Sequence, residues 1–492
     1  LLWVQDELSY DSFHKNADNI YKLENRVGTG SSIQIWTATA APIGKLAKQE
    51  LPEVKEVVRV CYNYFFNQFT VGGKTFDEEN KYFTDPSFFN VFDFGLIKGD
   101  KKNPFPDDHS VVMTVASAKL YFGDADPMGQ VITAEDSTKF TVSGVIADFP
   151  KNSSMRYNLL FPMSLYAKKL YSNTNDGKNL DNDFNQYNYD TYLVLQKGTS
   201  VTSLATKLRN IHLRMKSDDT DIMYLPFLAK NMHLYKSDGT EAGMETVRMF
   251  AIIALVILII ACINYVNLST ARSMLRSKEV SLRKIVGAGK MQLFVQFIIE
   301  TALLFLLAAI LALVLIPVLM PVFNSLSGKE LVFGLRNPQI WSVIGGTILG
   351  TLMVSSIYPA LLLSSFEPLK ALKGKVALRI NDVFFRKALV VVQFTLSVIL
   401  IVGTFVISRQ LNYIRSKELG YDKEHVFSFN MRQMSDHYDA MKATLLRQRG
   451  VQAVTRSNNA SIVNLTNQTG NNDFDGKEEG ETLMVYPVAV DK

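Results

Sequence analysis

The chain has 492 residues, of which 47% are hydrophobic and 20% are charged, and its formal net charge is +5. So small a net charge gives no support to nucleic-acid binding, which would need a concentrated basic face. The two cysteines, Cys61 and Cys262, exclude a disulfide framework and a cysteine-based zinc site, because the second lies inside an apolar run. Charged residues are plentiful up to about residue 248 and nearly vanish from several later blocks. This distribution indicates a soluble region joined to a membrane region.

The first four residues, LLWV, are apolar and are followed at once by polar and acidic residues. A secretory signal peptide would need a basic start and a longer apolar core. We therefore expect residues 1–4 to be the last turn of a membrane span that begins before residue 1. On this interpretation the chain is a piece of a longer protein.

Residues 5–247 combine the periodicities of strands and helices. The segments VKEVVRVCYNYFF (54–66) and TKFTVSGVIADF (138–149) are rich in β-branched and aromatic residues and predict strands. The segments APIGKLAKQEL (41–51) and VTSLATKLRNIHLRMK (201–216) repeat apolar residues at helical spacing. The region is long enough to fold as a separate α+β domain. It contains no hydrolase, metalloprotease or calcium-loop motif, so an enzymatic role has no support from the sequence.

Long charge-free runs dominate the region after residue 247. About 20 apolar residues are enough to cross the hydrocarbon core as a helix, and only helices or closed barrels satisfy their backbone polar groups there. These runs predict an α-helical membrane protein with four complete transmembrane helices plus the end of a first. They lie between Arg248 and Arg272, between Glu300 and Lys329, and over residues 337–366 and 388–408.

The orientation of the spans follows from the loops between them. Residues 272–290 hold six basic residues against one acidic, and residues 367–387 hold six against two. The positive-inside rule places both segments in the cytoplasm. Residues 5–247 then form an extracytoplasmic domain, and residues 248–366 form a three-span domain. Residues 367–387 form a cytoplasmic linker, residues 388–408 are the span that opens a second unit, and residues 409–492 start an incomplete second extracytoplasmic domain.

A short repeat supports the second unit. The pattern Val-x-x-Val-x-Arg occurs at 54–59 and again at 451–456. Each copy follows the exit of a membrane helix, so we interpret the repeat as the trace of a duplication.

The segment SLRKIVGAGKMQ (281–292) resembles a phosphate-binding loop at first sight. Such a loop is G-x-x-x-x-G-K-S/T and lies between a strand and a soluble helix. Here Lys284 stands in place of the first glycine, Met291 stands in place of the Ser/Thr, and a membrane helix follows. A nucleotide site in this segment is therefore excluded.

The same segment predicts a short amphipathic cytoplasmic helix instead. Leu275, Glu279, Leu282 and Val286 recur at helical spacing, and the basic side chains project elsewhere. Gly287 and a second glycine two residues later would end the helix before the next span. Two interpretations stay open: an interfacial helix bound to anionic lipid through its basic face, or a docking surface for a cytoplasmic partner.

Four residues predict contacts between the membrane helices. Gly346 and Gly350 form a G-x-x-x-G pair, which permits close approach of two helices. Asn264 and Asn267 carry amides that can form hydrogen bonds between helices.

The sequence also resembles a known family, the MacB/FtsX-type ABC-transporter permeases. The segments SKEVSLRKIVGAGKMQLFVQFIIET and YPALLLSSFEPLKALKG are similar to the cytoplasmic helix of that family and to the exit from its last span. The segments TDPSFFNVFDFGLIKGD, SAKLYFGDADPMGQVI and FTVSGVIADFPKNSSMRYNLLFP are similar to its MacB-type periplasmic core domain.

The resemblance implies a multi-pass permease of the bacterial inner membrane. It would have no catalytic, metal or cofactor site of its own, because ATP would be bound by a separate cytoplasmic ABC ATPase. The helix that contacts this ATPase would carry the coupling residues Arg276, Glu279, Leu282, Arg283, Lys284 and Gly287.

The resemblance further implies that ATP hydrolysis moves the extracytoplasmic domains, in export, efflux, lipoprotein extraction or mechanotransmission. A periplasmic or outer-membrane partner and contacts with membrane lipid are further expectations, and nucleic acid is not expected. The alternative is an envelope sensor or regulatory module that controls a partner enzyme or signalling protein without transporting a substrate.

Overall fold

A computed structural model describes most of the chain. The described residues are 1–28, 33–172, 177–331, 338–365, 380–417, 425–429, 431, 434, 437–457 and 488–491. They divide into two compact units. We call the first, Leu1–Phe13, Phe149–Met155 and Lys230–Ser416, the bundle unit, and the second, His14–Asp148, Arg156–Ala229 and Lys417–Lys492, the sheet unit. Most of the predicted cytoplasmic linker and of the predicted second extracytoplasmic domain lies outside the described residues.

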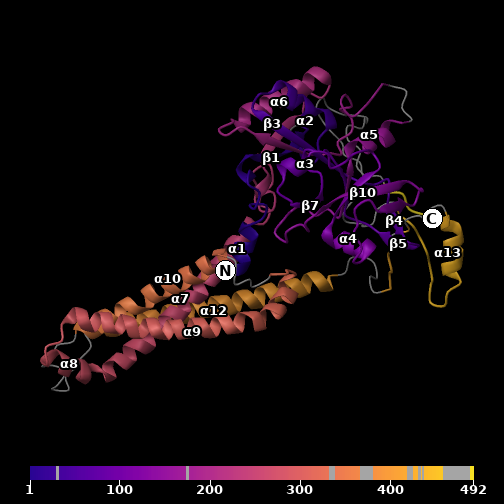
Figure 1. Ribbon diagram of the computed structural model, residues 1–492. Coiled ribbons are helices and arrows are strands. Elements are labelled where there is room, and N and C mark those ends of the chain that lie inside the picture. The colour runs from indigo at the N-terminus through magenta and orange to yellow at the C-terminus, as the bar shows by residue number, and fades with distance from the viewer. Residues whose placement is uncertain are drawn as a thin grey trace, which may run out of the picture. The chain divides into compact units, whose positions relative to one another are not determined.

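The sheet unit is built on a mixed 13-stranded sheet (Figure 1). The strand order is β13-β1-β12-β3-β6-β11-β8-β10-β9-β4-β5, with β2 paired to β1 and β7 paired to β10. The pairs β6–β11 and β8–β10 are parallel, and the other pairs are antiparallel. The strands are β1 Ile20–Val27, β2 Gln34–Trp36, β3 Val54–Tyr62, β4 Gln68–Val71, β5 Lys74–Asp77, β6 Lys81–Thr84, β7 Leu96–Gly99, β8 Ser110–Thr114, β9 Val131–Ala134, β10 Lys139–Ile146, β11 Leu159–Pro162, β12 Asp190–Leu195 and β13 Met223–Leu228.

Short helices accompany the sheet. Ser200 caps the start of α6 and Thr114 caps the start of α4, each by accepting a hydrogen bond from the backbone N–H three residues later. The predicted strands correspond to β3 and β10 and the predicted helices to α2 and α6, so these four predictions are confirmed. The helices assigned to this unit are η1 Ala17–Asn19, α2 Ala41–Glu50, α3 Phe88–Val91, α4 Val115–Phe122, α5 Met163–Tyr171, α6 Val201–Met215 and α13 Tyr438–Leu446, and η3 Ala229–Asn231 begins at its boundary.

Two hydrophobic cores stabilise the sheet unit. The first lies around α2 and α6 and includes Ile43, Leu204 and Leu208, all of which are fully buried. The second is aromatic and includes Phe66, Phe69, Phe83, Phe140 and Phe161. Because aromatic side chains bury large apolar areas, this second core accounts for the aromatic strands seen in the sequence.

Gly44 lets α2 approach the sheet closely. A Cβ atom at this position would lie 2.8 Å from Val57 Cγ1 and 3.0 Å from Thr191 Cγ2. Both neighbours are β-branched and therefore stiff. We expect Gly44→Val to destabilise the sheet unit by about 1–3 kcal/mol through overpacking, measured by thermal unfolding of the full chain in detergent. Gly95→Val is the matched control, because a Cβ there meets no atom within 4 Å. An equal loss of stability in both variants would contradict the prediction.

The bundle unit consists of long helices (Figure 1). Four of them are long and apolar enough to cross a membrane: Met244–Arg272, Lys290–Ser327, Ile340–Leu361 and Phe384–Ser416. By length and composition, these helices fit the membrane spans that the sequence predicts. The helices of this unit are α1 Leu2–Leu8, α7 Met244–Leu275, α8 Ser277–Ile285, α9 Lys290–Ser327, α10 Pro338–Ser365 and α12 Ile380–Ser416.

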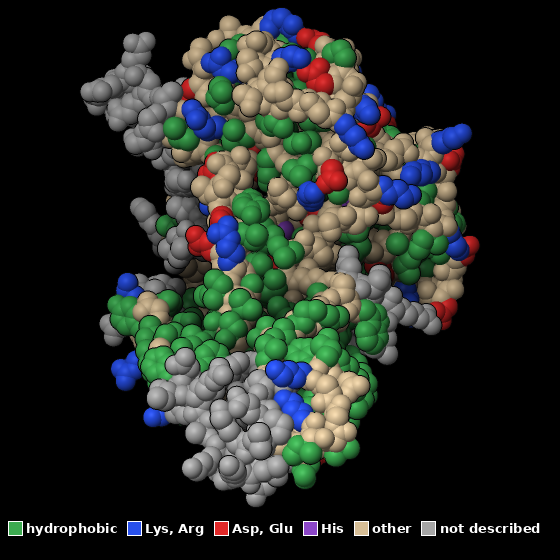
Figure 2. Space-filling model, turned by 90° about the vertical axis from the view of Figure 1, so that its left-hand side faces the viewer, with side chains coloured by type: hydrophobic (Ala, Val, Ile, Leu, Met, Phe, Trp, Pro, Cys, Tyr) green, Lys and Arg blue, Asp and Glu red, His purple; other side chains and the backbone are tan. Residues whose placement is uncertain are grey.

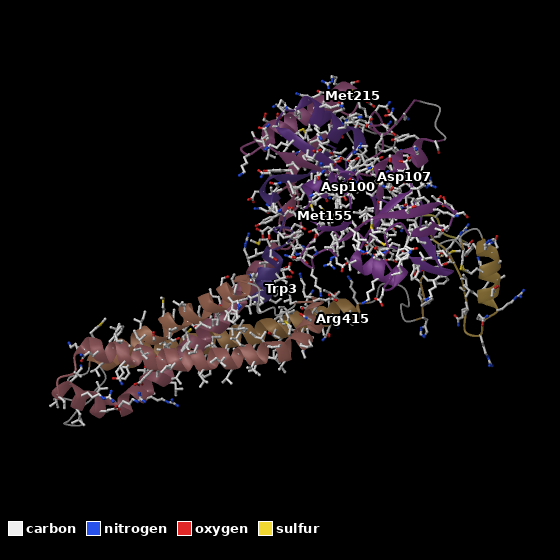
Figure 3. The ribbon with its side chains drawn as sticks, viewed as in Figure 1. Trp3, Asp100, Asp107, Met155, Met215 and Arg415 are labelled. Carbon is white, nitrogen blue, oxygen red and sulfur yellow. The ribbon has the colours of Figure 1, made fainter. Side chains whose placement is uncertain are left out.

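Hydrophobic side chains cover the visible surface of the bundle helices, whereas charged side chains are spread over the sheet unit (Figure 2). α1 packs on α7 through Trp3 and Phe250, whose ring centroids are 4.8 Å apart. Figure 3 labels Trp3 on α1 and Arg415 near the end of α12. α12 extends beyond the span predicted at 388–408 in both directions.

Candidate functional site

The inner end of the bundle carries the short helix that the sequence predicted, α8. It lies between α7 and α9 and ends at Ile285. Gly287 has a φ of 105°, a conformation that favours glycine over other residues. The turn closes at Gly289, whose backbone N–H donates to Gln292 Oε1 at 3.0 Å. Gly287 therefore serves the turn between α8 and α9.

The inward face of α8 is formed by two small or medium-sized side chains. Val280 and Ser281 are 2% and 0% exposed, and Val280 belongs to a small core with Leu293 and Phe297 of α9 and with Ala360 of α10. The small side chain of Ser281 permits close packing on this side. The buried face of α8 is therefore formed by Val280 and Ser281 and not by Leu282 and Val286.

Three of the four residues of the predicted stripe face outward, and the side chain of the fourth, Leu275, lies outside the described part of the structure. Leu282 and Val286 are 54% and 87% exposed, and the side chain of Glu279 is 54% exposed. With Arg283, whose side chain is 45% exposed, these residues span only about 100° around the helix. The four side chains therefore form one exposed surface, which we call the α8 surface.

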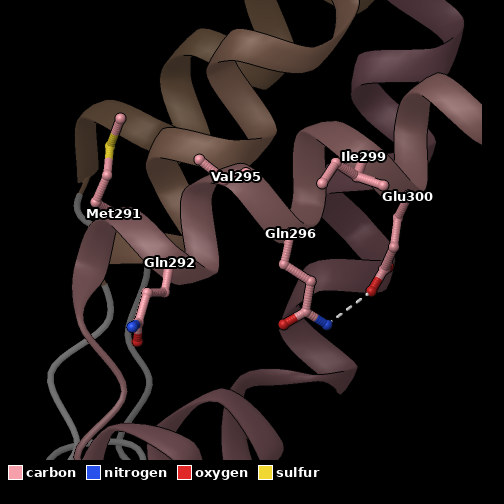
Figure 4. Close-up of a pocket in the computed structure, with 6 residues that line it drawn as sticks. All are labelled: Met291, Gln292, Val295, Gln296, Ile299 and Glu300. Atoms are coloured by element: carbon pink, nitrogen blue, oxygen red, sulfur yellow. Dashed lines mark hydrogen bonds between the residues drawn. The ribbon is translucent and has the colours of Figure 1, made fainter.

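A chain of polar side chains joins α8 to α9. Arg276 Nη1 donates to Glu300 Oε2 at 2.6 Å, and Gln296 Nε2 donates to Glu300 Oε1 at 3.0 Å (Figure 4). Arg283 Nη1 donates to Gln296 Oε1 at 2.8 Å, and Arg283 pairs with Glu279 at 2.7 Å. We call these five residues the inner network. Because its ionic groups are about half exposed, each pair contributes modest stability, but together they fix the orientation of α8 on α9.

Two of these residues were not among the predicted site residues. Gln296 and Glu300 lie one helical turn apart on α9. A glutamate and a glutamine at i, i+4 spacing within an otherwise apolar run were the signal that could have identified them.

Lys284 lies on the inward side of α8, with Val280 and Ser281. Burial lowers the pKa of Lys284, and the charge of Lys290 lowers it further. Lys284 therefore lies apart from the α8 surface, although the sequence grouped it with the coupling residues.

Two grooves flank the α8 surface. The first, of about 480 Å³, lies between Leu282 and Val286 on one side and Gln292 and Leu293 on the other. The second, of about 670 Å³, runs along α9 from Met291 to Glu300 (Figure 4). Apolar walls with a few polar groups suit the binding of a protein segment. Among the described residues no group of His, Cys, Asp and Glu could hold a metal ion.

Among the described residues, Gly346, Gly350, Asn264 and Asn267 show no contact that joins two membrane helices as predicted. A Cβ at Gly346 or Gly350 would meet no atom within 4 Å, so no other helix approaches closely there. Asn264 is exposed on α7. Asn267 Oδ1 is buried without a hydrogen-bond partner.

A tyrosine supplies an interhelical hydrogen bond instead. Tyr265 OH on α7 donates to Thr301 Oγ1 on α9 at 3.1 Å. Tyr265 directly follows Asn264, which the sequence analysis singled out. The sequence analysis thus located the right part of α7 for an interhelical hydrogen bond but named the wrong side chain.

Comparison with known proteins gives two family matches that lie one after the other along the chain. Residues 1–211 match the MacB-like periplasmic core domain, and residues 251–368 match the FtsX-like permease C-terminal domain. Among curated proteins, the macrolide export ATP-binding/permease protein MacB of Aggregatibacter actinomycetemcomitans is 25% identical over 256 residues. This match covers 49% of the chain and 35% of that protein. The matched part thus spans little more than a third of that relative.

Solved structures resemble part of the chain. A domain of a permease protein from Porphyromonas gingivalis is 20% identical, with a TM-score of 0.37 over 44% of this chain and 92% of that one. The periplasmic region of MacB from Actinobacillus actinomycetemcomitans is 17% identical, with a TM-score of 0.31 over 43% of this chain and 89% of that one.

Proposed function

We propose that this chain, which belongs to the MacB/FtsX-type ABC transporter permeases, couples ATP hydrolysis on a separate cytoplasmic ATPase to movement of its extracytoplasmic domain. ATP would be bound by the ATPase subunit, and the permease would lie in the inner membrane of a bacterium. The observation that carries the proposal is the α8 surface, on which apolar side chains stay exposed at the tip of the bundle.

The composition of the α8 surface favours a protein partner over lipid. A helix that lies on a membrane separates an apolar face, which enters the bilayer, from a basic face. On α8 the apolar Leu282 and Val286 share one face with the charged Glu279 and Arg283. Exposed apolar groups surrounded by charges are typical of a protein interface, in which a desolvated centre is ringed by polar groups.

The names of the relatives suggest which process the movement of the extracytoplasmic domain drives. The curated relatives carry the name of a macrolide export protein, and export or efflux is therefore the first candidate. Lipoprotein extraction and mechanotransmission are related forms of the same coupling. A periplasmic or outer-membrane protein that binds the sheet unit is part of the proposal.

Photo-crosslinking in cells tests the proposed docking. A photoreactive amino acid at Val286 is expected to capture the ATPase, since this side chain is 87% exposed on the α8 surface. The matched control is Leu326, which is 84% exposed near the other end of α9 and is expected to capture no ATPase. Capture of lipid alone at Val286 would favour the interfacial-helix interpretation and count against the proposal.

A further inference from the structure

Five side chains form a polar cluster at the outer end of the bundle unit. They are Asp6, Glu7, Tyr10, His233 and Lys329, and we call them the outer cluster. The Lys329 ammonium group contacts Glu7 Oε1 at 2.6 Å and Asp6 Oδ2 at 3.1 Å. It also donates to the Tyr10 hydroxyl at 3.0 Å. The side chains of Lys329, Asp6 and Glu7 are only 19%, 21% and 9% exposed, so these charges are largely shielded from water.

Glu7 joins the outer ends of three helices. Its second oxygen, Oε2, lies 2.5 Å from His233 Nε2, and the His233 ring stacks on Tyr10 with centroids 3.6 Å apart. Glu7 belongs to α1, His233 precedes α7, and Lys329 follows α9. One carboxylate of α1 thus contacts a group before α7 and a group after α9.

The outer cluster lies close in sequence to the points where the chain passes into the sheet unit. The bundle unit gives way to the sheet unit after Phe13, and again on either side of the segment Phe149–Met155. That segment is bound to α1 and its C-terminal extension. Asn152 Nδ2 donates to the Ser9 carbonyl at 3.1 Å, and the backbone N–H of Ser154 donates to Asp11 Oδ1 at 2.9 Å. A displacement of α1 would therefore reach the connections to the sheet unit.

Lys329 is held in its charged form. Burial by itself would lower the pKa of Lys329, but its hydrogen bonds to Glu7, Tyr10 and Asp6 outweigh that effect and raise the pKa above its ordinary value. Removal of this cation would leave Asp6 and Glu7 next to each other without the charge that neutralises them. Since Lys329 binds the loop after α9 to Asp6 and Glu7 of α1 and to Tyr10 just beyond it, its removal would let this loop separate from α1.

α9 connects the outer cluster to the inner network. It is one continuous helix of 38 residues, Lys290–Ser327, about 57 Å long. At the start of α9, Gln296 and Glu300 hold α8 through the inner network. Lys329 follows directly after Gly328, which caps the other end of the helix in the left-handed conformation.

We propose that Lys329 is a positioning residue that transmits displacement of α9 to α1, and through α1 to the segments that continue into the sheet unit. This inference rests on the proposed function, because it requires α9 to move when the partner ATPase binds or hydrolyses ATP.

Dipolar EPR on the full chain tests the inference, in lipid nanodiscs with its ATPase. Spin labels on cysteines introduced at Leu326 and Phe405 report whether α9 moves relative to α12. Labels at Leu8 and Leu326 report whether α1 follows α9. Leu8 is 51% exposed, Leu326 is 84% exposed and Phe405 is 69% exposed. The native cysteines are buried. Each pair is measured with ADP and with a non-hydrolysable ATP analogue.

In the wild type, the 326–405 distance is expected to change with nucleotide while the 8–326 distance stays constant. In Lys329→Met the 8–326 distribution is expected to broaden and to become nucleotide-dependent. Lys329→Arg keeps the cation and is expected to restore the narrow distribution. The matched control is Lys98→Met, which removes a lysine of the sheet unit that pairs with Asp126 where both side chains are exposed, at 46% and 64%, and it is expected to behave like the wild type.

Each contrary result identifies what fails. If the ATPase does not co-purify, or the 326–405 distance is insensitive to nucleotide, the proposed function fails and this inference fails with it. If the 326–405 distance changes while the 8–326 distribution of Lys329→Met matches the wild type, only the role of Lys329 is overturned. The role of Lys329 is likewise overturned if the 8–326 distance of the wild type itself changes with nucleotide.

Discussion

Aspartate in place of Leu282 or Val286 is expected to abolish stable association with the ATPase and to leave the fold of the permease intact. Both side chains are exposed in the free chain, at 54% and 87%, so a carboxylate there is hydrated and costs little. In the complex, the substitution would lose about 1.5–3 kcal/mol of apolar burial. It would also bury a charge without a partner, which costs further free energy. A combined loss of about 3 kcal/mol or more corresponds to at least roughly 100-fold weaker binding.

The measurement is the dissociation constant of the purified permease and ATPase in detergent, together with co-purification from cells. Val131→Asp is the matched control, since Val131 is an exposed valine on β9, in the sheet unit, and its replacement should not alter binding. Unchanged affinity in both α8 variants would exclude the α8 surface as the docking site. Reduced affinity in the Val131 variant as well would point to a general effect of added charge.

Asp85→Ala is expected to produce the largest loss of stability in the sheet unit, about 3–5 kcal/mol. Arg59 binds Asp85 through two side-chain hydrogen bonds, Nε to Oδ2 and Nη2 to Oδ1, each 2.9 Å long. The Arg59 backbone N–H donates to the same carboxylate at 2.9 Å. The two side chains are only 12% and 18% exposed, so the variant would leave a buried guanidinium without its counter-ion.

Thermal unfolding followed by tryptophan fluorescence measures this loss, because Trp36 reports on the sheet unit. A loss of 3 kcal/mol corresponds to a decrease in Tm of roughly 6–12 °C for a domain of about 200 residues. Asp126→Ala is the control: its pair with Lys98 is exposed, at 64% and 46%, so its loss should change the Tm far less than the loss of Asp85. Similar decreases in Tm in the two variants would show that the buried pair stabilises the sheet unit no more than the exposed pair does.

The Arg59 pair also gives a structural meaning to the repeat in the sequence. Val54, Val57 and Arg59 belong to β3, where the two valines are buried and the arginine pairs with the residue that follows β6. The second copy, at 451–456, has no assigned secondary structure, and residues 458–487 lie outside the described part. The duplication stays a prediction.

Sequence periodicity predicted the elements of the sheet unit better than their assembly. β3, β10, α2 and α6 follow from local patterns of apolar residues, because each buries one face or stripe against the same core. The order of 13 strands, with two parallel pairs among antiparallel ones, depends on contacts between residues far apart in sequence. No local pattern carries that information.

The functional end of the bundle shows where apolar periodicity misleads. A stripe of apolar residues predicts burial when the helix has one core to face. On α8 the inward positions are Val280 and Ser281, and the more apolar positions Leu282 and Val286 face outward. On α8 the usual relation between apolarity and burial is thus reversed, and the proposed docking of a partner would account for this reversal.

The small and polar residues of the membrane helices illustrate a different limit. A G-x-x-x-G pair allows close packing but does not select the partner helix, and Gly346 and Gly350 face open space within this chain. Glycines, asparagines and tyrosines in a span all have the potential to make contacts. Which of them do so depends on the rotation of each helix, and this explains why Tyr265 rather than Asn264 bonds to α9.

The length of α9 makes the protein sensitive to the thickness of its bilayer. The 28 residues between Glu300 and Lys329 carry no charge and would extend about 42 Å as a helix, whereas the hydrocarbon core is about 30 Å thick. A hydrophobic stretch longer than the core is accommodated by tilting or by local thickening of the lipid. Thin and thick membranes would therefore hold α9 at different angles, and the lipid composition would set the resting tilt of α9.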